Sequence, residues 1–232
     1  MDDIAKIIDQ TFLKKNASGE EIEKVCQETK QYGFRGLCLF PEYTKQAAEL
    51  LRNSGIKIIT LIDEPTGSRP TQDRLAMVRN AKEDGTDEVD LVMKIDDFKN
   101  GKYDRVLADL QENCRVLPVK VIIGSGYLTD EEIKKASEIV KQAGAICVKT
   151  ATLKDPLDRA ELEEKAKHIK IMKESAPGLL IKASGSIRTF NDVKKMVEQG
   201  ADIIGTSSGV EIVDQAKGEE DANKNEDWRK IE

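Results

Sequence analysis

The feature that most constrains the fold is a short apolar run followed by a charged, amphipathic stretch, a pair that occurs eight times. Each run has the length of a β-strand, and each pair has the length of one βα unit. The runs lie at residues 8–13, 36–40, 56–62, 88–93, 119–124, 145–149, 179–183 and 202–206. Eight such units in an uninterrupted chain predict an α/β fold, a single-domain (β/α)8 TIM barrel.

The stretches between the runs are predicted helices, two of which begin with capping-box spacing, at Ser18 and Thr129. The run at 8–13 is the weakest predicted strand. A doubly wound open sheet is the structural alternative, but it would normally place a glycine-rich fingerprint after its first strand, and the sequence has none. We assign residues 1–213 to the barrel and 214–232 to a charged C-terminal tail or helix.

Composition excludes several classes of partner. The formal net charge of −6 favours neither nucleic acid nor an anionic membrane. The sequence has no run of 18 apolar residues and no basic-plus-apolar leader, so we expect no membrane span and a cytoplasmic location. The 4 cysteines form no C-x-x-C pair, which is typical of reduced, buried thiols in a cytoplasmic protein.

Two lysines interrupt apolar runs near the predicted carboxyl ends of strands, where a barrel carries its active site. Lys149 ends one run and Lys182 lies in the next, while Asp90 lies in the run at 88–93. Burial and a neighbouring cation both favour the neutral amine, which is the nucleophilic form of lysine. Two adjacent lysines and a carboxylate for proton transfer therefore predict Schiff-base chemistry.

The structural alternative is that each strand lysine is only a salt-bridge partner or extends out of the sheet to solvent. We interpret Lys120 in this way, because it lies near the amino end of its predicted strand. The occurrence of Lys149 and Lys182 together, each before a cluster of small and hydroxyl residues, favours the functional interpretation for that pair.

The segments after the seventh and eighth runs, "SGSIRT" and "GTSSGV", are rich in small residues. In (β/α)8 barrels these two loops commonly bind phosphate, because small residues let backbone N–H groups approach an anion. The alternative is two tight turns without a ligand. The candidate phosphate-binding residues are Gly185, Ser186, Gly205, Ser207 and Ser208.

His168 is the only histidine. A zinc-dependent aldolase generally needs several histidine ligands, and no other His, Cys or acid cluster has metal-binding spacing. We expect His168 to be a surface residue of a charged helix. The sequence therefore predicts no metal and no cofactor.

These segments resemble deoxyribose-phosphate aldolase, the class I Schiff-base aldolase family with a (β/α)8 barrel. The segments that carry the resemblance are "DEVDLV", "VKTAT", "KASGSIRT" and "GTSSG", and it extends from residue 8 to 210. It implies that Lys149 forms the Schiff base, that Lys182 is the second lysine that activates it, and that Asp90 transfers protons. It further implies substrate or phosphate contacts for Thr150, Lys154, Asp9, Thr11 and Cys38.

The sequence departs from the family pattern around the expected mouth of the barrel. Gly124 replaces a usual glutamate and Ser186 a usual glycine, Phe40 stands in place of asparagine or tyrosine, and Asp63 and Glu64 add negative charge. We expect these acids to repel a phosphorylated substrate unless they face away or pair with Arg69 or Lys94. The altered residues bear on substrate preference.

The resemblance implies a lyase that cleaves 2-deoxy-D-ribose 5-phosphate to D-glyceraldehyde 3-phosphate and acetaldehyde, reversibly and without a cofactor. A related Schiff-base aldolase with a different aldehyde acceptor and a non-catalytic sugar-phosphate-binding paralogue remain alternatives. The expected partner is a small phosphorylated sugar, and the chain is a candidate homo-oligomer.

Overall fold

The computed structural model of the protein describes residues 4–151, 156–157 and 161–228, with side chains through residue 219. All strands are parallel and follow one another around a closed barrel, which β1 and β8 complete by pairing. The strands are β1 (Ile8–Phe12), β2 (Gly36–Leu39), β3 (Lys57–Ile62), β4 (Glu88–Val92), β5 (Val119–Ile122), β6 (Cys147–Lys149), β7 (Leu180–Ser184) and β8 (Ile203–Thr206). The predicted barrel is confirmed, and the closed sheet excludes the doubly wound alternative.

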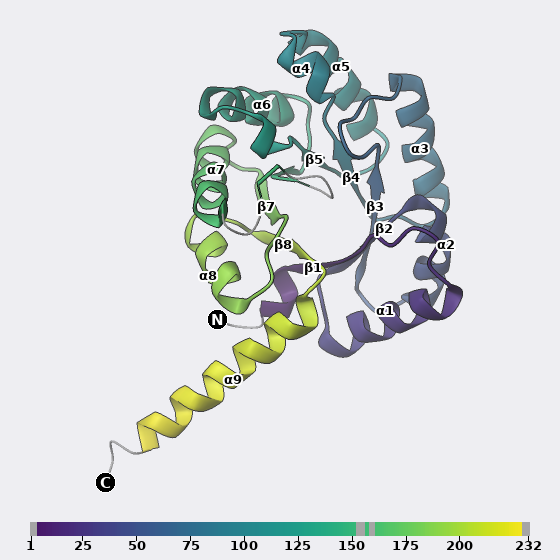
Figure 1. The fold of residues 1–232 in the computed structure, drawn as a ribbon. Helices are drawn as coiled ribbons and strands as arrows, with labels where there is room; N and C mark the ends of the chain where they lie inside the picture. The colour runs from purple at the N-terminus through teal and green to yellow at the C-terminus, as the bar shows by residue number, and fades with distance from the viewer. Residues whose placement is uncertain (1–3, 152–155, 158–160, 229–232) are drawn as a thin grey trace.

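Helices surround the barrel and bury its outer face (Figure 1). They are α1 (Gly19–Tyr32), α2 (Pro41–Leu50), α3 (Thr71–Glu83), α4 (Ile95–Lys99), α5 (Tyr103–Cys114), α6 (Asp130–Gln142), α7 (Leu162–Ser175), α8 (Phe190–Glu198) and α9 (Gly209–Trp228), with the 3-10 turns η1 (Ile4–Ile7) and η2 (Ser125–Tyr127). Because each helix returns the chain to the amino end of the next strand, the carboxyl ends of all strands meet at one mouth.

The least strand-like run, at residues 8–13, closes the barrel. Asp9 of β1 is in register with Gly36 of β2 on one side and with Gly205 of β8 on the other. Gly36 leaves room for the Asp9 carboxylate, because a Cβ at this position would lie 3.1 Å from Oδ1 of Asp9 and 2.9 Å from the carbonyl oxygen of Lys57. The polar residues that weakened the strand prediction thus lie where the barrel interior carries charge.

Side-chain caps begin three of the helices next to the barrel. Ser18 and Thr129 form the predicted capping boxes of α1 and α6. Thr189 forms another with Asp192 at the start of α8, and the same carboxylate accepts the N–H of Arg188 at 2.9 Å. This cap anchors the loop that leaves β7, one of the two predicted phosphate loops.

The C-terminal segment, predicted as a tail or a helix, is helical in α9 as far as Trp228. Its first part packs on the barrel through Ile212, Val213 and Ala216, and the rest extends away from the body (Figure 1). Among the described residues, no helix combines the length and the apolar character that crossing a bilayer requires.

Candidate active site

The three side chains predicted to be catalytic meet inside the barrel. Asp90 lies in β4, Lys149 ends β6, and Lys182 of β7 is the register partner of Lys149. Nζ of Lys149 lies 2.7 Å and Nζ of Lys182 lies 2.9 Å from the same atom, Oδ2 of Asp90. One carboxylate oxygen therefore links the two amines.

Asp9 lies deeper inside the barrel than a residue that contacts substrate would. Its Oδ2 accepts a hydrogen bond of 2.5 Å from Nζ of Lys182, and its Oδ1 accepts one of 2.7 Å from Arg35. Cys38 lies on the other side of the cluster, with its Sγ 3.8 Å from Oδ2 of Asp90. Burial raises the pKa of Cys38 to about 11, and the Asp90 carboxylate adds to this rise, so the thiol stays protonated and donates.

The sequence interpretation missed the lower half of this cluster. Lys120 of β5 is fully buried in the barrel, where its Nζ lies 2.7 Å from Glu88 and 3.1 Å from Oδ1 of Asp90. Arg35 joins Glu88 to Asp9 with contacts of 2.7 Å to each. Of the two alternatives for Lys120, the salt-bridge partner is confirmed, and extension to solvent is excluded because the closed barrel surrounds the side chain.

The charges in the cluster reinforce one another. Burial alone would raise the pKa of Asp90, but Lys120, Lys149 and Lys182 outweigh burial and hold that pKa well below its ordinary value. Burial alone would lower the pKa of Lys182, but Asp9 and Asp90 outweigh it and raise that pKa. Asp90 is therefore ionised and Lys182 stays a cation across the neutral range.

A cavity of about 410 Å³ opens above the cluster at the carboxyl ends of the strands, a size typical of small-molecule sites. Among the predicted site residues, it is lined by Thr11, Lys149, Gly185, Ser186, Gly205 and Ser207. Asp90, Lys182, Asp9 and Cys38 are buried and do not line it. Lys149 is thus the one predicted catalytic residue that reaches the cavity.

Ser184 and Arg188 are among the lining residues that were not predicted as site residues. Ser184, at the end of β7, has a buried Oγ without a hydrogen-bond partner among the described residues. Arg188 places a cation at the cavity from the loop between β7 and α8. The glycines and serines of "SGSIRT" indicated a phosphate loop, but the arginine beside them is the stronger signal for an anion.

Two other predicted residues, Thr150 and Ser208, do not line the cavity. Thr150 connects β6 to β7, because its Oγ1 donates to the carbonyl of Ser184 and accepts from the N–H of Ser184, both at 2.9 Å. Ser208 donates its N–H to Thr206 within the loop after β8. Lys154 lies outside the described residues.

Gly205 is required where β8 passes the cluster. A Cβ at this position would lie 2.3 Å from Oγ of Ser184 and 2.9 Å from Cε of Lys182. We therefore expect Gly205→Ala to lower the free energy of unfolding by about 1–3 kcal/mol, measured by denaturant titration. Gly218→Ala in α9 is the control, because its Cβ meets nothing within 4 Å. Equal losses in both variants would contradict this packing account.

The acidic residues near the mouth do not face the cavity. Oδ2 of Asp63 lies 2.5 Å from the buried guanidinium of Arg74, and Oδ1 lies 3.5 Å from Arg69. This is the pairing with Arg69 that the sequence analysis named as the way to avoid repulsion, with Arg74 as a further partner. Glu64, Gly124 and Phe40 also do not line the cavity, so Ser186 is the one substituted position that does.

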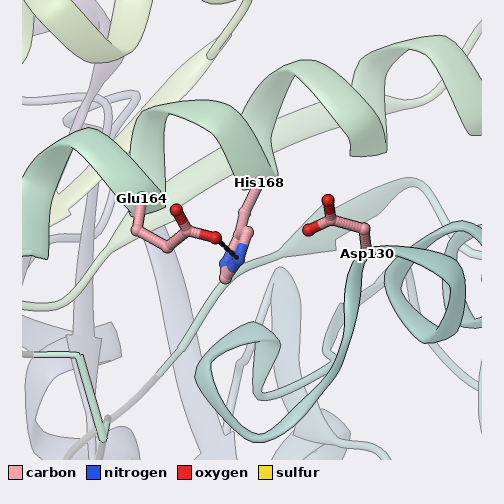
Figure 2. A group of neighbouring side chains, drawn as sticks. All are labelled: Asp130, Glu164 and His168. Atoms are coloured by element: carbon pink, nitrogen blue, oxygen red, sulfur yellow. Dashed lines mark ion pairs between the residues drawn. The ribbon is translucent and has the colours of Figure 1, made fainter.

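The prediction that His168 is a surface residue is wrong. It is 3% exposed on α7, and its Nε2 lies 3.3 Å from Oε1 of Glu164. Asp130 of α6 faces this pair, and the three ligand atoms lie within 4.8 Å of one another (Figure 2), a cluster that the sequence spacing did not reveal. The ammonium of Lys167 lies 2.8 Å from Asp130 and 3.1 Å from Glu164, so both carboxylates already have a cationic partner.

The family model described as "DeoC/LacD family aldolase" matches residues 4–223. The chain belongs to the DeoC/LacD family of aldolases. The deoxyribose-phosphate aldolase of Thermococcus gammatolerans is 42% identical over 226 residues, which cover 94% of this chain and 98% of the relative. The DeoC/LacD match therefore includes every strand that contributes to the charged cluster.

Solved structures similar to this DeoC/LacD family chain have the same architecture. The aldolase QR15 superposes with a TM-score of 0.87 and 35% identity, covering 94% of this chain and 97% of its own. A deoxyribose phosphate aldolase from Aeropyrum pernix, described as a unique tetramer, superposes with a TM-score of 0.82 and 29% identity, covering 92% and 90%.

Proposed function

We propose that this DeoC/LacD family aldolase cleaves 2-deoxy-D-ribose 5-phosphate to acetaldehyde and D-glyceraldehyde 3-phosphate through a Schiff base on Lys149. The observation that carries the proposal is the position of Lys149. Its amine is buried on the side of Asp90 yet lines the cavity, so a substrate carbonyl can reach it. Lys182 and Lys120 are buried behind it and do not line the cavity.

Charge balance inside the barrel supports the assignment of the nucleophile to Lys149. Among the described residues, the cluster joins four cationic side chains to three carboxylates, so loss of one proton makes it neutral. The cations are Arg35, Lys120, Lys149 and Lys182, and the carboxylates are Asp9, Glu88 and Asp90. Arg35, Lys120 and Lys182 each contact two or more carboxylates, whereas Lys149 contacts Asp90 alone, so its neutralisation removes the least attraction.

The proposed reaction starts when the neutral amine of Lys149 attacks the aldehyde carbon C1. Loss of water gives a protonated imine, which accepts the electron pair of the C2–C3 bond as the C3 hydroxyl loses its proton. Glyceraldehyde 3-phosphate leaves, the enamine is protonated at C2, and water releases acetaldehyde. Oδ2 of Asp90 contacts the Lys149 nitrogen, so we assign this carboxylate the proton transfers there, through water for C2.

The phosphate is proposed to bind between the loops after β7 and β8, beside Arg188. We expect Arg188→Gln to raise the KM for the phosphorylated sugar about tenfold, because a charge-assisted contact is lost. Steady-state kinetics should show no such change for 2-deoxyribose, which lacks the phosphate. Arg79→Gln, on the exposed face of α3, is the matched control. A similar loss with both sugars would contradict the placement of the phosphate.

A cleavage assay tests the proposed function. Purified protein incubated with 2-deoxyribose 5-phosphate should release acetaldehyde and glyceraldehyde 3-phosphate in equal amounts. Release of neither product would contradict it.

An aldolase with another acceptor is less favoured, because Asp63, Glu64, Gly124 and Phe40 do not line the cavity. A non-catalytic paralogue is less favoured because Lys149, Lys182 and Asp90 are in contact.

We further propose that the enzyme works in the cytoplasm as a homo-oligomer. The four cysteines are free, as in a reducing compartment. The related protein from Aeropyrum pernix is described as tetrameric. Light scattering on the purified chain measures its assembly state directly.

A further inference from the structure

Lys165 is a fully buried lysine that lies outside the charged cluster. It projects from α7, and its Nζ donates a hydrogen bond of 2.6 Å to the carbonyl oxygen of Gly185. Taking an ammonium group out of water is costly unless strong hydrogen bonds replace the lost hydration. A contact that offsets this cost restrains the backbone atom it holds.

The backbone that Lys165 holds is strained. Gly185 and Ser186 are consecutive left-handed residues, with φ of 91° and 58°. Glycine adopts this conformation freely, whereas a residue with a side chain, such as Ser186, adopts it at an energetic cost. Both residues line the cavity, so neighbouring contacts maintain a loop shape that the local sequence alone does not favour.

The direction of the restraint follows from peptide geometry. In a planar trans peptide, the C=O of Gly185 and the N–H of Ser186 point in opposite directions. Because Lys165 approaches the carbonyl from α7, which packs against β7 and α8 on the outer ring (Figure 1), the Ser186 N–H points away from α7. A cation on the carbonyl also polarises the amide and makes its N–H a stronger donor to an anion.

We propose that Lys165 is a positioning residue that acts through the Gly185–Ser186 peptide to present the Ser186 N–H to the substrate phosphate. This proposal rests on the proposed function for its substrate. Lys165 is not among the described residues that line the cavity, so it is expected to set binding of the phosphate and to leave the chemistry on Lys149 unchanged.

Lys165→Met tests the proposal, with Lys167→Met as the matched control on the exposed side of the same helix. The Lys165 variant is expected to raise the KM for 2-deoxyribose 5-phosphate and the inhibition constant of inorganic phosphate, each about tenfold, with kcat preserved. Its kcat/KM for 2-deoxyribose should match the wild type. Equal losses with both sugars, or unchanged phosphate inhibition, would overturn the proposal.

Calorimetric titration with inorganic phosphate separates this proposal from the proposed function, because it needs no turnover. About tenfold weaker binding in Lys165→Met than in the wild type supports the positioning role even if neither sugar is cleaved. Equal binding, or no binding to the wild type, overturns the role. Where Lys165→Met does not fold, Lys165→Gln replaces it in the same titration, and weaker or equal binding decides in the same way.

Discussion

Lys149→Met is expected to lower kcat for 2-deoxyribose 5-phosphate by about 10⁴-fold or more. The reason is that neither Lys120 nor Lys182, the other lysines of the cluster, lines the cavity. The expected loss is in chemistry rather than in folding. Removal of this cation leaves three cations facing three carboxylates, and Asp90 keeps its contacts with Lys120 and Lys182. We therefore expect the free energy of unfolding to fall by less than the roughly 3–5 kcal/mol that is typical when a buried charge is left without a partner.

The measurement is a product assay together with denaturant unfolding of the same preparation. Lys94→Met is the matched control, since Lys94 bonds only the Arg69 carbonyl among the contacts described and stands outside the cavity. Activity within tenfold of the wild type in the Lys149 variant would show that another residue forms the covalent intermediate. A large loss of stability would contradict the charge balance.

Lys182→Met is expected to lower activity at pH 7 by about 100-fold and to move the acidic limb of the pH–rate profile to higher pH. The direction of this pH shift follows from the charges of the cluster. Lys182 stays charged because Asp9 and Asp90 raise its pKa, so it is a constant positive neighbour of Lys149 through Oδ2 of Asp90. Without it, Asp90 has one cationic neighbour fewer and attracts the Lys149 ammonium more strongly, so the acidic limb moves to higher pH.

A full pH–rate profile of kcat/KM separates this electrostatic role from a structural one. At high pH the Lys182 variant should recover a large part of the lost rate, because the loss is electrostatic and depends on pH. Lys94→Met should leave the acidic limb in place. A Lys182 variant whose rate falls equally at every pH would contradict the assigned role.

The fold was predictable because strand and helix periodicity is local. Even the weak run at residues 8–13 could be placed, since a barrel of this type needs an eighth strand. The grouping of Asp90, Lys149 and Lys182 was also predictable, because both lysines lie near the carboxyl ends of apolar runs, Asp90 lies inside another run, and parallel strands of a barrel converge on one interior.

The other features of the site depend on tertiary packing, which no local sequence pattern predicts. Lys120 occupies the same kind of apolar run as Lys149, but its burial against Glu88 follows only from barrel closure and register. His168 and Lys165 belong to a highly charged helix, and only the docking of α7 shows that both side chains are buried. The charges alone predicted an exposed helix.

Reduction of the wild-type protein with borohydride in the presence of acetaldehyde, followed by peptide mass spectrometry, tests the central claim most directly. The account predicts an ethyl group on the nitrogen of Lys149, because this amine alone among the cluster lysines reaches the cavity. Lys120 and Lys182 should remain unmodified. Modification of either of these in place of Lys149, or of no lysine, would contradict the account.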